Sequence, residues 1–78
     1  MKTYELRPAD GRKSFYGKCY VREDSDGTET LYSYNTPIIR REPNGKMHRL
    51  WWGWSATTGR HIRAFCGMNK AEFTALPA

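Results

Sequence analysis

Two short turns divide the first two thirds of the chain and limit the folds available to it. Asp26-Gly27 and Asn44-Gly45 each stand between stretches with strand character. Such pairs are the strongest local signal for a β-hairpin, because these residues tolerate the left-handed backbone that tight turns require. We predict a type I′ geometry for the second turn. The sequence therefore indicates antiparallel strands joined by hairpins.

Strand character follows from the alternation of apolar and polar residues around these turns. The predicted strands are Phe15–Arg22, Thr30–Tyr34, Ile38–Arg41 and Lys46–Trp54. Asn35-Thr36-Pro37 is expected to break or bend the chain between the second and the third of them. Residues 1–14 are polar and basic, and they are predicted to form either a mobile arm or a short edge strand.

Alternation also predicts which residues of a strand face the core, because successive side chains point to opposite faces. In the first strand it places Cys19 and Val21 inward. In the last strand it leaves Trp51 as the one tryptophan available for contacts. The residues predicted to pack there against the following helix are Leu50, Trp52 and Trp54.

The last strand is predicted to pass directly into a helix. Ser55 is a favourable N-cap, and Gly67 is a natural residue for the left-handed conformation after a helix, so the helix spans Ala56 to about Cys66. A glycine inside a helix costs roughly 1 kcal/mol relative to alanine. Gly59 therefore indicates a close approach, most simply to one of the tryptophans before the helix.

A second, short helix is predicted near the C-terminus. Asn69 and Glu72 have the spacing of a capping box, and the turns that follow can bury Phe73 and Leu76 before Pro77. The whole chain, residues 1–78, is thus expected to form one α+β domain of two layers. It would comprise an antiparallel β-meander of three to five strands, one main helix and a short C-terminal helix, in the order β-β-β-β-α-α.

The charge balance favours a polyanionic partner. The chain has 13 Lys and Arg against 8 Asp and Glu, which gives a net charge of +5, and DNA or RNA is the partner that such a balance suits. Free N–H groups at the start of the main helix also suit a phosphate, although simple capping by Ser55 is the alternative. The candidate nucleic-acid contacts are Arg40, Arg41, Arg49, Trp51, Ser55, Thr57, Thr58, Arg60 and Arg63.

An aromatic sheet face offers a different function, a protein–protein module. Tyr16, Tyr20 and Tyr34 are the candidate residues of this interaction face. The partner would be a host protein or a second copy of the chain, because a wide aromatic patch seldom stays exposed. Aromatic rings among cations can also stack on single-stranded bases. The remaining alternative is that the tyrosines pair across strands and shield the sheet.

The histidines and cysteines support only remote or structural roles. His48 and His61 are conceivable as the acid–base pair of a small ribonuclease. The simpler interpretation of His61 is a hydrogen bond from helix to strand at the edge of the core. Cys19 and Cys66 lie outside any CxxC motif and are interpreted as small buried apolar residues. We expect no metal, no cofactor and no membrane segment, and a cytoplasmic location in a bacterial host.

Three runs carry a resemblance to a known family. They are KSFY at 13–16, SYNT at 33–36 and SATTxxHIxxF at 55–65. In these runs the chain resembles a family of small uncharacterised proteins encoded by phages and mobile elements of Gram-positive gut bacteria, over most of residues 13–73. The resemblance implies the setting of a phage or mobile-element accessory protein, and it brings no mechanism with it.

Overall fold

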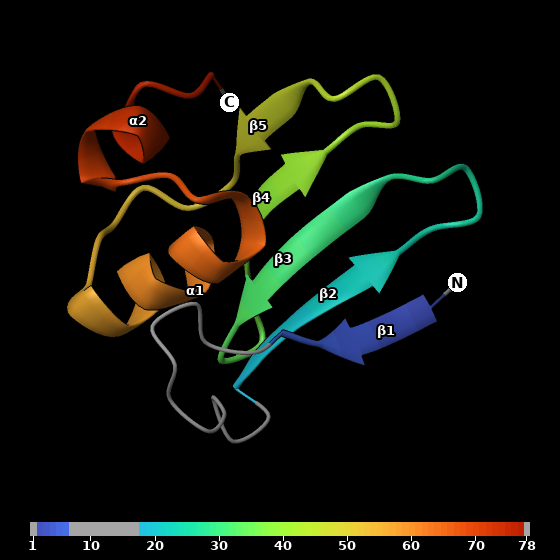
Figure 1. Cartoon of the computed structure of the whole chain (residues 1–78), viewed down its shortest axis with the longest axis horizontal. Coiled ribbons are helices and arrows are strands. Elements are labelled where there is room, and N and C mark those ends of the chain that lie inside the picture. The colour runs from blue at the N-terminus through green and yellow to red at the C-terminus, as the bar shows by residue number, and fades with distance from the viewer. Residues whose placement is uncertain (1, 7–17, 78) are drawn as a thin grey trace.

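The computed structural model describes residues 2–6 and 18–77. They form a five-stranded antiparallel sheet in the meander order β1-β2-β3-β4-β5, followed by two helices (Figure 1). The bounds are β1 Lys2–Glu5, β2 Cys19–Glu23, β3 Glu29–Ser33, β4 Thr36–Arg41, β5 Met47–Arg49, α1 Ala56–Cys66 and α2 Lys70–Thr74. The predicted α+β class, meander and two helices are confirmed. No helix in this part of the chain is long and apolar enough to cross a membrane.

The two glycine turns form hairpins, but with a different geometry from the predicted one. Gly27 donates to the carbonyl of Asp24 at 3.0 Å, and Gly45 donates to that of Glu42 at 2.8 Å. Only the glycine in each turn has a positive φ, 92° and 90° respectively. A type I′ turn needs positive φ at both central residues. The type I′ prediction for Asn44-Gly45 is therefore wrong, and the glycine instead follows the turn in a left-handed conformation.

The turn with two left-handed residues lies between β3 and β4. Tyr34 and Asn35 have φ of 51° and 70°, and Ser33 pairs with Thr36 on either side of them. The chain thus reverses at this point, one residue earlier than the predicted break, and Thr36 and Pro37 belong to β4. Proline in a strand gives up one backbone donor. The composition of Asn35-Thr36-Pro37 predicted an interruption but not its exact place.

A β-bulge lets two consecutive isoleucines face the core. Leu31 pairs with Ile39 while Tyr32 pairs with Pro37, so Ile38 is an extra residue in β4. Ile38 and Ile39 are 1% and 0% exposed. Regular alternation would have turned one of them to solvent. The bulge therefore increases the buried area that a short strand contributes.

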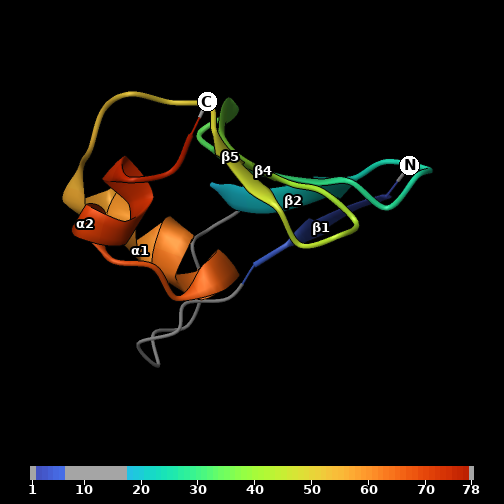
Figure 2. The same ribbon diagram turned by 90° about the horizontal axis from the view of Figure 1, so that it is seen from above.

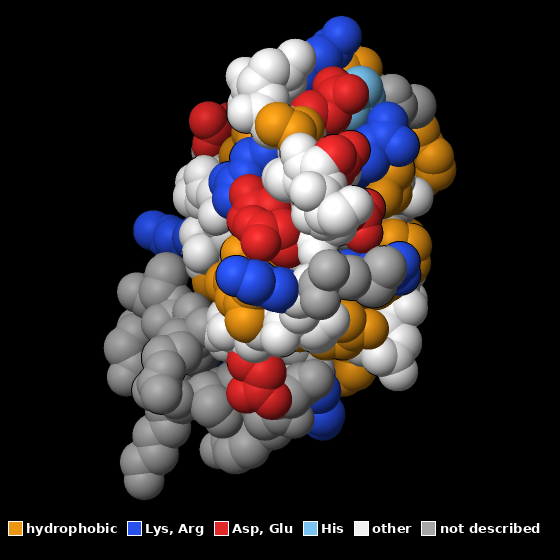
Figure 3. Space-filling model, turned by 90° about the vertical axis from the view of Figure 1, so that its right-hand side faces the viewer, with side chains coloured by type: hydrophobic (Ala, Val, Ile, Leu, Met, Phe, Trp, Pro, Cys, Tyr) orange, Lys and Arg blue, Asp and Glu red, His pale blue; other side chains and the backbone are white. Residues whose placement is uncertain are grey.

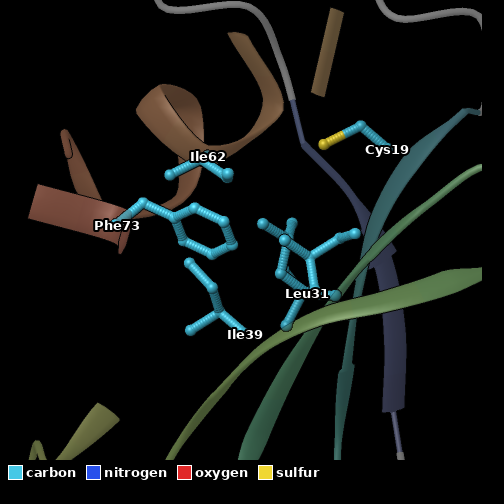
Figure 4. Close-up of a cluster of buried hydrophobic side chains, with 7 residues drawn as sticks. Cys19, Leu31, Ile39, Ile62 and Phe73 are labelled. Atoms are coloured by element: carbon cyan, nitrogen blue, oxygen red, sulfur yellow. The ribbon is translucent and has the colours of Figure 1, made fainter. Parts of the chain in front are cut away.

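The core lies between one face of the sheet and the two helices, which both cover that face (Figure 2). Cys19 and Val21 point inward as predicted, and both are completely buried. Burial raises the pKa of the Cys19 thiol to about 12, and burial likewise raises the pKa of Cys66; both thiols are free. The buried apolar residues, shown in Figure 4, are Cys19, Val21, Leu31, Ile38, Ile39, Ile62 and Phe73.

Strand β5 ends earlier than predicted, and this changes the roles of the tryptophans. Pairing with β4 stops at Arg49, so the two-residue alternation no longer governs the residues after it. Trp52 is 64% exposed, whereas Trp51 is partly buried against the core. The predicted orientations of these two residues are thus both wrong. Trp54 packs against the core as predicted.

Both helices begin and end as the capping signals predict. Ser55 Oγ accepts a hydrogen bond from the backbone of Thr58 at 3.1 Å, and Gly67 ends α1 with φ 76°. In α2, the side chains of Asn69 and Glu72 each accept from the other residue's backbone N–H, at 2.9 and 3.0 Å. These reciprocal bonds satisfy donors that a helix start leaves without partners.

Arg49 joins the sheet to the C-terminal helix from inside the molecule. Its side chain is nearly buried, and Nε donates to the carbonyl of Trp51 at 2.9 Å while Nη1 donates to that of Thr74 at 3.3 Å. The guanidinium carbon lies 4.5 Å from the ring centre of Trp52 and 4.8 Å from that of Phe73. Such cation–π contacts gain strength when the cation is desolvated. The structure therefore gives Arg49, which the sequence suggested as a nucleic-acid contact, a structural role within the fold.

A buried polar cluster fixes α1 on β3. Ser33 Oγ lies 2.8 Å from His61 Nδ1 and 3.2 Å from Thr58 Oγ1, and all three residues are buried. The predicted hydrogen bond from His61 to a strand is confirmed. Burial, and to a smaller extent the charge of Arg60, lower the pKa of His61 below its ordinary value of 6.5. The fold therefore favours the neutral imidazole.

We expect Arg49→Ala to lower the free energy of unfolding by about 2–4 kcal/mol, because it removes two part-buried hydrogen bonds and the packing of a nearly buried side chain between two rings. Urea denaturation measures this change. Arg40→Ala is the control, since Arg40 is exposed on the same pair of strands, and it should change stability by no more than about 0.5 kcal/mol. Equal losses in the two variants would contradict the role assigned to Arg49.

The lowered pKa of His61 predicts a loss of stability in acid. Below its unfolded pKa the unfolded chain binds a proton that the folded state resists, so the free energy of unfolding falls as the pH drops from about 7.5 to about 5. His61→Gln, which keeps a hydrogen-bonding side chain without titrating, should flatten this dependence. Urea denaturation at several pH values tests it, with His48→Gln as control. Parallel pH profiles for the wild type and His61→Gln would refute the prediction.

Candidate nucleic-acid interface

An open hollow of about 220 Å³ lies where the first half of α1 meets the segment that leads into α2. The two helices are next to each other in both views of the ribbon (Figures 1 and 2). We call this site the basic hollow. Its lining residues are Trp54, Ala56, Gly59, Arg60, Arg63, Met68, Asn69 and Lys70.

Three cationic side chains border the basic hollow. Arg60 and Arg63 are three residues apart on α1, a spacing that places them on neighbouring parts of one helix face. Lys70 is the first residue of α2. Arg63 and Lys70 are exposed, and Arg60 is partly buried. Both helices thus contribute positive charge to the basic hollow. The sequence predicted the contribution of Arg60 and Arg63.

Lys70 is the cation that sequence reasoning missed. It follows the N-cap Asn69 directly. A positive side chain is unfavourable at a helix start, because the helix dipole is positive there. Lys70 therefore does not stabilise the start of α2 through the dipole. Its contribution to the site became apparent only when the structure placed Lys70 beside the arginines of α1.

Trp54 lies beneath these cations in a fixed position. Its ring packs against Phe73, with the ring centres 5.9 Å apart, and it also covers Gly59. A Cβ atom on Gly59 would lie 2.5 Å from Cζ2 of Trp54, closer than real atoms approach. The predicted close approach at Gly59 is thus confirmed, and its partner is Trp54. An aromatic surface held in this way needs no rearrangement to receive a ligand.

The hydroxyl groups at the start of α1 serve the fold. Ser55 caps the helix, and the Thr58 side chain is buried against Ser33. Thr57 is partly buried and is not part of the lining of the basic hollow. In the structure Ser55 thus caps the helix by accepting from the backbone of Thr58, and the Thr58 side chain packs inside the fold.

The two arginines of β4 point to opposite faces of the sheet, so they do not form one surface. Arg41 donates from Nη2 and Nε to Oε1 of Glu29 at 2.8 and 3.0 Å, and its guanidinium carbon lies 4.2 Å from the ring centre of Phe65. Arg40 pairs with His48 across the strands on the outer face, which the helices leave uncovered. Of the predicted cations, only Arg60 and Arg63 come together.

The outer face of the sheet carries a stacked pair of tyrosines. The rings of Tyr20 and Tyr32 are 5.0 Å apart and nearly parallel, at 3°, and the hydroxyl of Tyr20 donates to Oδ1 of Asn35 at 2.9 Å. Tyr34 is 52% exposed in the turn after β3. Tyr16 lies outside the described residues. Tyr20 thus pairs across the strands with Tyr32, as the cross-strand alternative predicts.

The two histidines do not form an acid–base pair. His48 lies on the outer face, where its Nε2 is 2.9 Å from Oε2 of Glu42. His61 is buried under the inner face against Ser33. The sheet separates the two imidazoles, so one substrate cannot contact both. The ribonuclease hypothesis therefore loses the geometry on which it depended.

Charges at the hairpin end of the molecule are mixed in sign. Figure 3 views this end and shows acidic and basic side chains interspersed on the surface. Arg22 lies 3.5 Å from Asp24, and Arg41 lies 2.8 Å from Glu29. Pairs of this kind leave little net field at a distance. The charged residues that line the basic hollow are Arg60, Arg63 and Lys70, which are all positive.

Comparison with known proteins assigns the chain to a family. The family of unknown function DUF8033 matches residues 4–74, and the chain belongs to it. The chain matches no curated protein and no solved structure significantly. The match includes both helices and all the residues that line the basic hollow.

The packing of Trp54 on Gly59 predicts an unusual response to alanine. Gly→Ala inside a helix ordinarily stabilises by about 1 kcal/mol. Here Gly59→Ala should destabilise by about 1–3 kcal/mol, because the new methyl group displaces a packed ring. In a Trp54→Phe background, whose smaller ring lacks Cζ2, the same change should cost much less. A double-mutant cycle by urea denaturation measures the coupling, and additive effects would contradict the contact.

Proposed function

We propose that this protein is a small non-enzymatic binding module that contacts DNA or RNA through backbone phosphates at the basic hollow. The observation that carries the proposal is the convergence of Arg60, Arg63 and Lys70 from two helices around one open site. Guanidinium groups bind phosphate oxygens with two parallel hydrogen bonds, and a lysine adds a point charge. A site bordered by both types suits a chain of phosphates.

The energetic cost of this arrangement also supports the proposal. Like charges three residues apart on a helix repel each other, and a lysine at a helix start opposes the dipole. Each effect costs a few tenths of a kcal/mol at an exposed site. A bound polyanion would convert these costs into favourable interactions. Lys70 is thus a cation at a position where the helix dipole favours other residues, whereas Arg63 lies in the last turn of α1, where the dipole favours a cation.

The cellular setting remains part of the proposal. The net charge of +5 attracts polyanions over a distance and speeds their association. An accessory protein of a phage or mobile element, acting in the cytoplasm of a bacterial host, would meet nucleic acid there. The resemblance of the KSFY, SYNT and SATTxxHIxxF runs supports this setting.

A protein–protein module is the second candidate, and the uncovered outer face of the sheet favours it. The helices lie on the other face, and Tyr20 and Tyr32 stand on the outer one (Figure 2). A host protein or a second copy of the chain would bury this pair. Protein binding that survives nuclease treatment and is lost in Tyr32→Asp would favour this function over the first.

We expect wild-type protein to bind labelled oligonucleotides with an affinity that falls steeply as salt rises. Arg63→Ala and Lys70→Ala should each weaken binding and reduce the slope of log K against log salt by about 0.7–0.9, the contribution of one phosphate contact. Fluorescence anisotropy at several salt concentrations measures both quantities.

Arg40→Ala is the matched control for this titration, because Arg40 is exposed on the outer face of the sheet. It should leave the salt slope nearly unchanged. If wild-type protein shows no salt-dependent binding to any strand, the proposed function is wrong. If Arg40→Ala weakens binding as much as Arg63→Ala does, the site is on the outer face and not in the basic hollow.

A further inference from the structure

We infer that the basic hollow accepts one unpaired nucleotide of a single strand, with its base against Trp54 and Met68 and its flanking phosphates on the bordering cations. The inference rests on the proposed function and specifies its ligand. It follows from the composition of the lining, from the size of the hollow and from the positions of the cations beside Trp54.

The lining combines cations with apolar surface. Trp54 and Met68 line the same hollow as Arg60, Arg63 and Lys70. A phosphate gains nothing from an indole ring or a thioether, so a site for phosphates alone has no use for them. A nucleobase has apolar faces that stack on aromatic side chains, and each stacked base contributes substantially to affinity. The two kinds of lining residue therefore match the two parts of a nucleotide.

The hollow is small and concave. Its volume of about 220 Å³ is below the range of roughly 300–1,000 Å³ typical of small-molecule pockets. It therefore has room for one flat ring system with open access from solvent. A duplex keeps its bases paired and stacked, and extruding one of them costs several kcal/mol. A single strand presents splayed bases at no such cost.

The positions of the cations suit a strand that passes over the hollow. Arg60 and Arg63 border it from α1, and Lys70 borders it from the start of α2. Positive charge thus comes to the hollow from both helices. A nucleotide has a phosphate on each side of its sugar, so its base can enter while both phosphates stay near cations.

The outer sheet face is also aromatic, with Tyr20 and Tyr32 stacked at 5.0 Å and nearly parallel. Trp54 packs on Phe73 and covers Gly59, and it is one of the residues that line the hollow together with the cations. Its position beside the cations is what favours Trp54 as the platform for a base.

Fluorescence of Trp54 tests the inference directly. The chain has three tryptophans, so a Trp51→Phe/Trp52→Phe variant, checked by circular dichroism, emits from Trp54 alone. The probes are oligo(dT), oligo(U), an abasic strand of equal length and a duplex. Both base-containing single strands should change Trp54 emission in a saturable way, and their relative affinities show whether DNA or RNA is preferred. The abasic strand should bind about 5- to 150-fold more weakly, the loss expected for one stacked base.

Variants then separate the contribution of the base to the affinity from the contribution of the phosphates. Trp54→Leu should weaken binding of oligo(dT) by a larger factor than binding of the abasic strand, so that the difference between the two strands is lost. Trp54→Phe, which keeps a ring, should retain most of the preference for bases and guards against a folding defect in the leucine variant. Arg63→Ala should weaken both strands by a similar factor.

The outcomes distinguish this inference from the proposed function. If no probe binds, the proposed function fails and the inference fails with it. If all four probes bind with equal affinity and similar salt dependence, or if Trp54 emission does not respond to the base-containing strands, the proposed function stands and the inference is overturned. Tighter binding of the duplex than of oligo(dT) would also overturn it.

Discussion

The docking of a five-residue helix on the sheet depends on Arg49. Its backbone N–H donates to the carbonyl of Pro77 at 2.6 Å, and its guanidinium donates to the carbonyl of Thr74 at the last turn of α2. A helix this short does not persist in water without tertiary contacts. A cation at the end of a helix also stabilises its dipole. The arginine therefore holds in place the element that carries Lys70 and Phe73.

A continuous set of contacts leads from Arg49 to the basic hollow. The guanidinium packs on Phe73, Phe73 packs on Trp54, and Trp54 covers Gly59 of α1. The rings are rigid, and Gly59 has no side chain to hold the Trp54 ring away from the helix. The position of each of these residues therefore restricts the position of the next. The hollow exists because α1 and α2 are fixed relative to each other through these contacts. A ligand would therefore meet a preformed site and would lose little affinity to its ordering.

Local signals predicted much of the fold, and long-range contacts account for the rest. The caps of both helices, the hairpins and the close packing at Gly59 follow from residues near one another in sequence. The bulge at Ile38 and the inward orientation of Arg49 depend on the partner strand and on the C-terminal segment, which alternation does not describe. The candidate site was predicted in part for the same reason. Arg60 and Arg63 are close in sequence and share a helix face, whereas Lys70 joins them only through the docking of α2.

Among the described residues, charges of mixed sign and charges of one sign lie in different places. At the hairpin end, Arg22 and Arg41 each lie beside a carboxylate, and the surface is mixed in sign (Figure 3). The charged residues that line the basic hollow are all positive, and Glu72 lies close by in the first turn of α2. A charge asymmetry of this kind orients a molecule in the field of a polyanion before contact. The end that carries the preformed hollow would thus approach first, so electrostatic attraction and shape act at the same place.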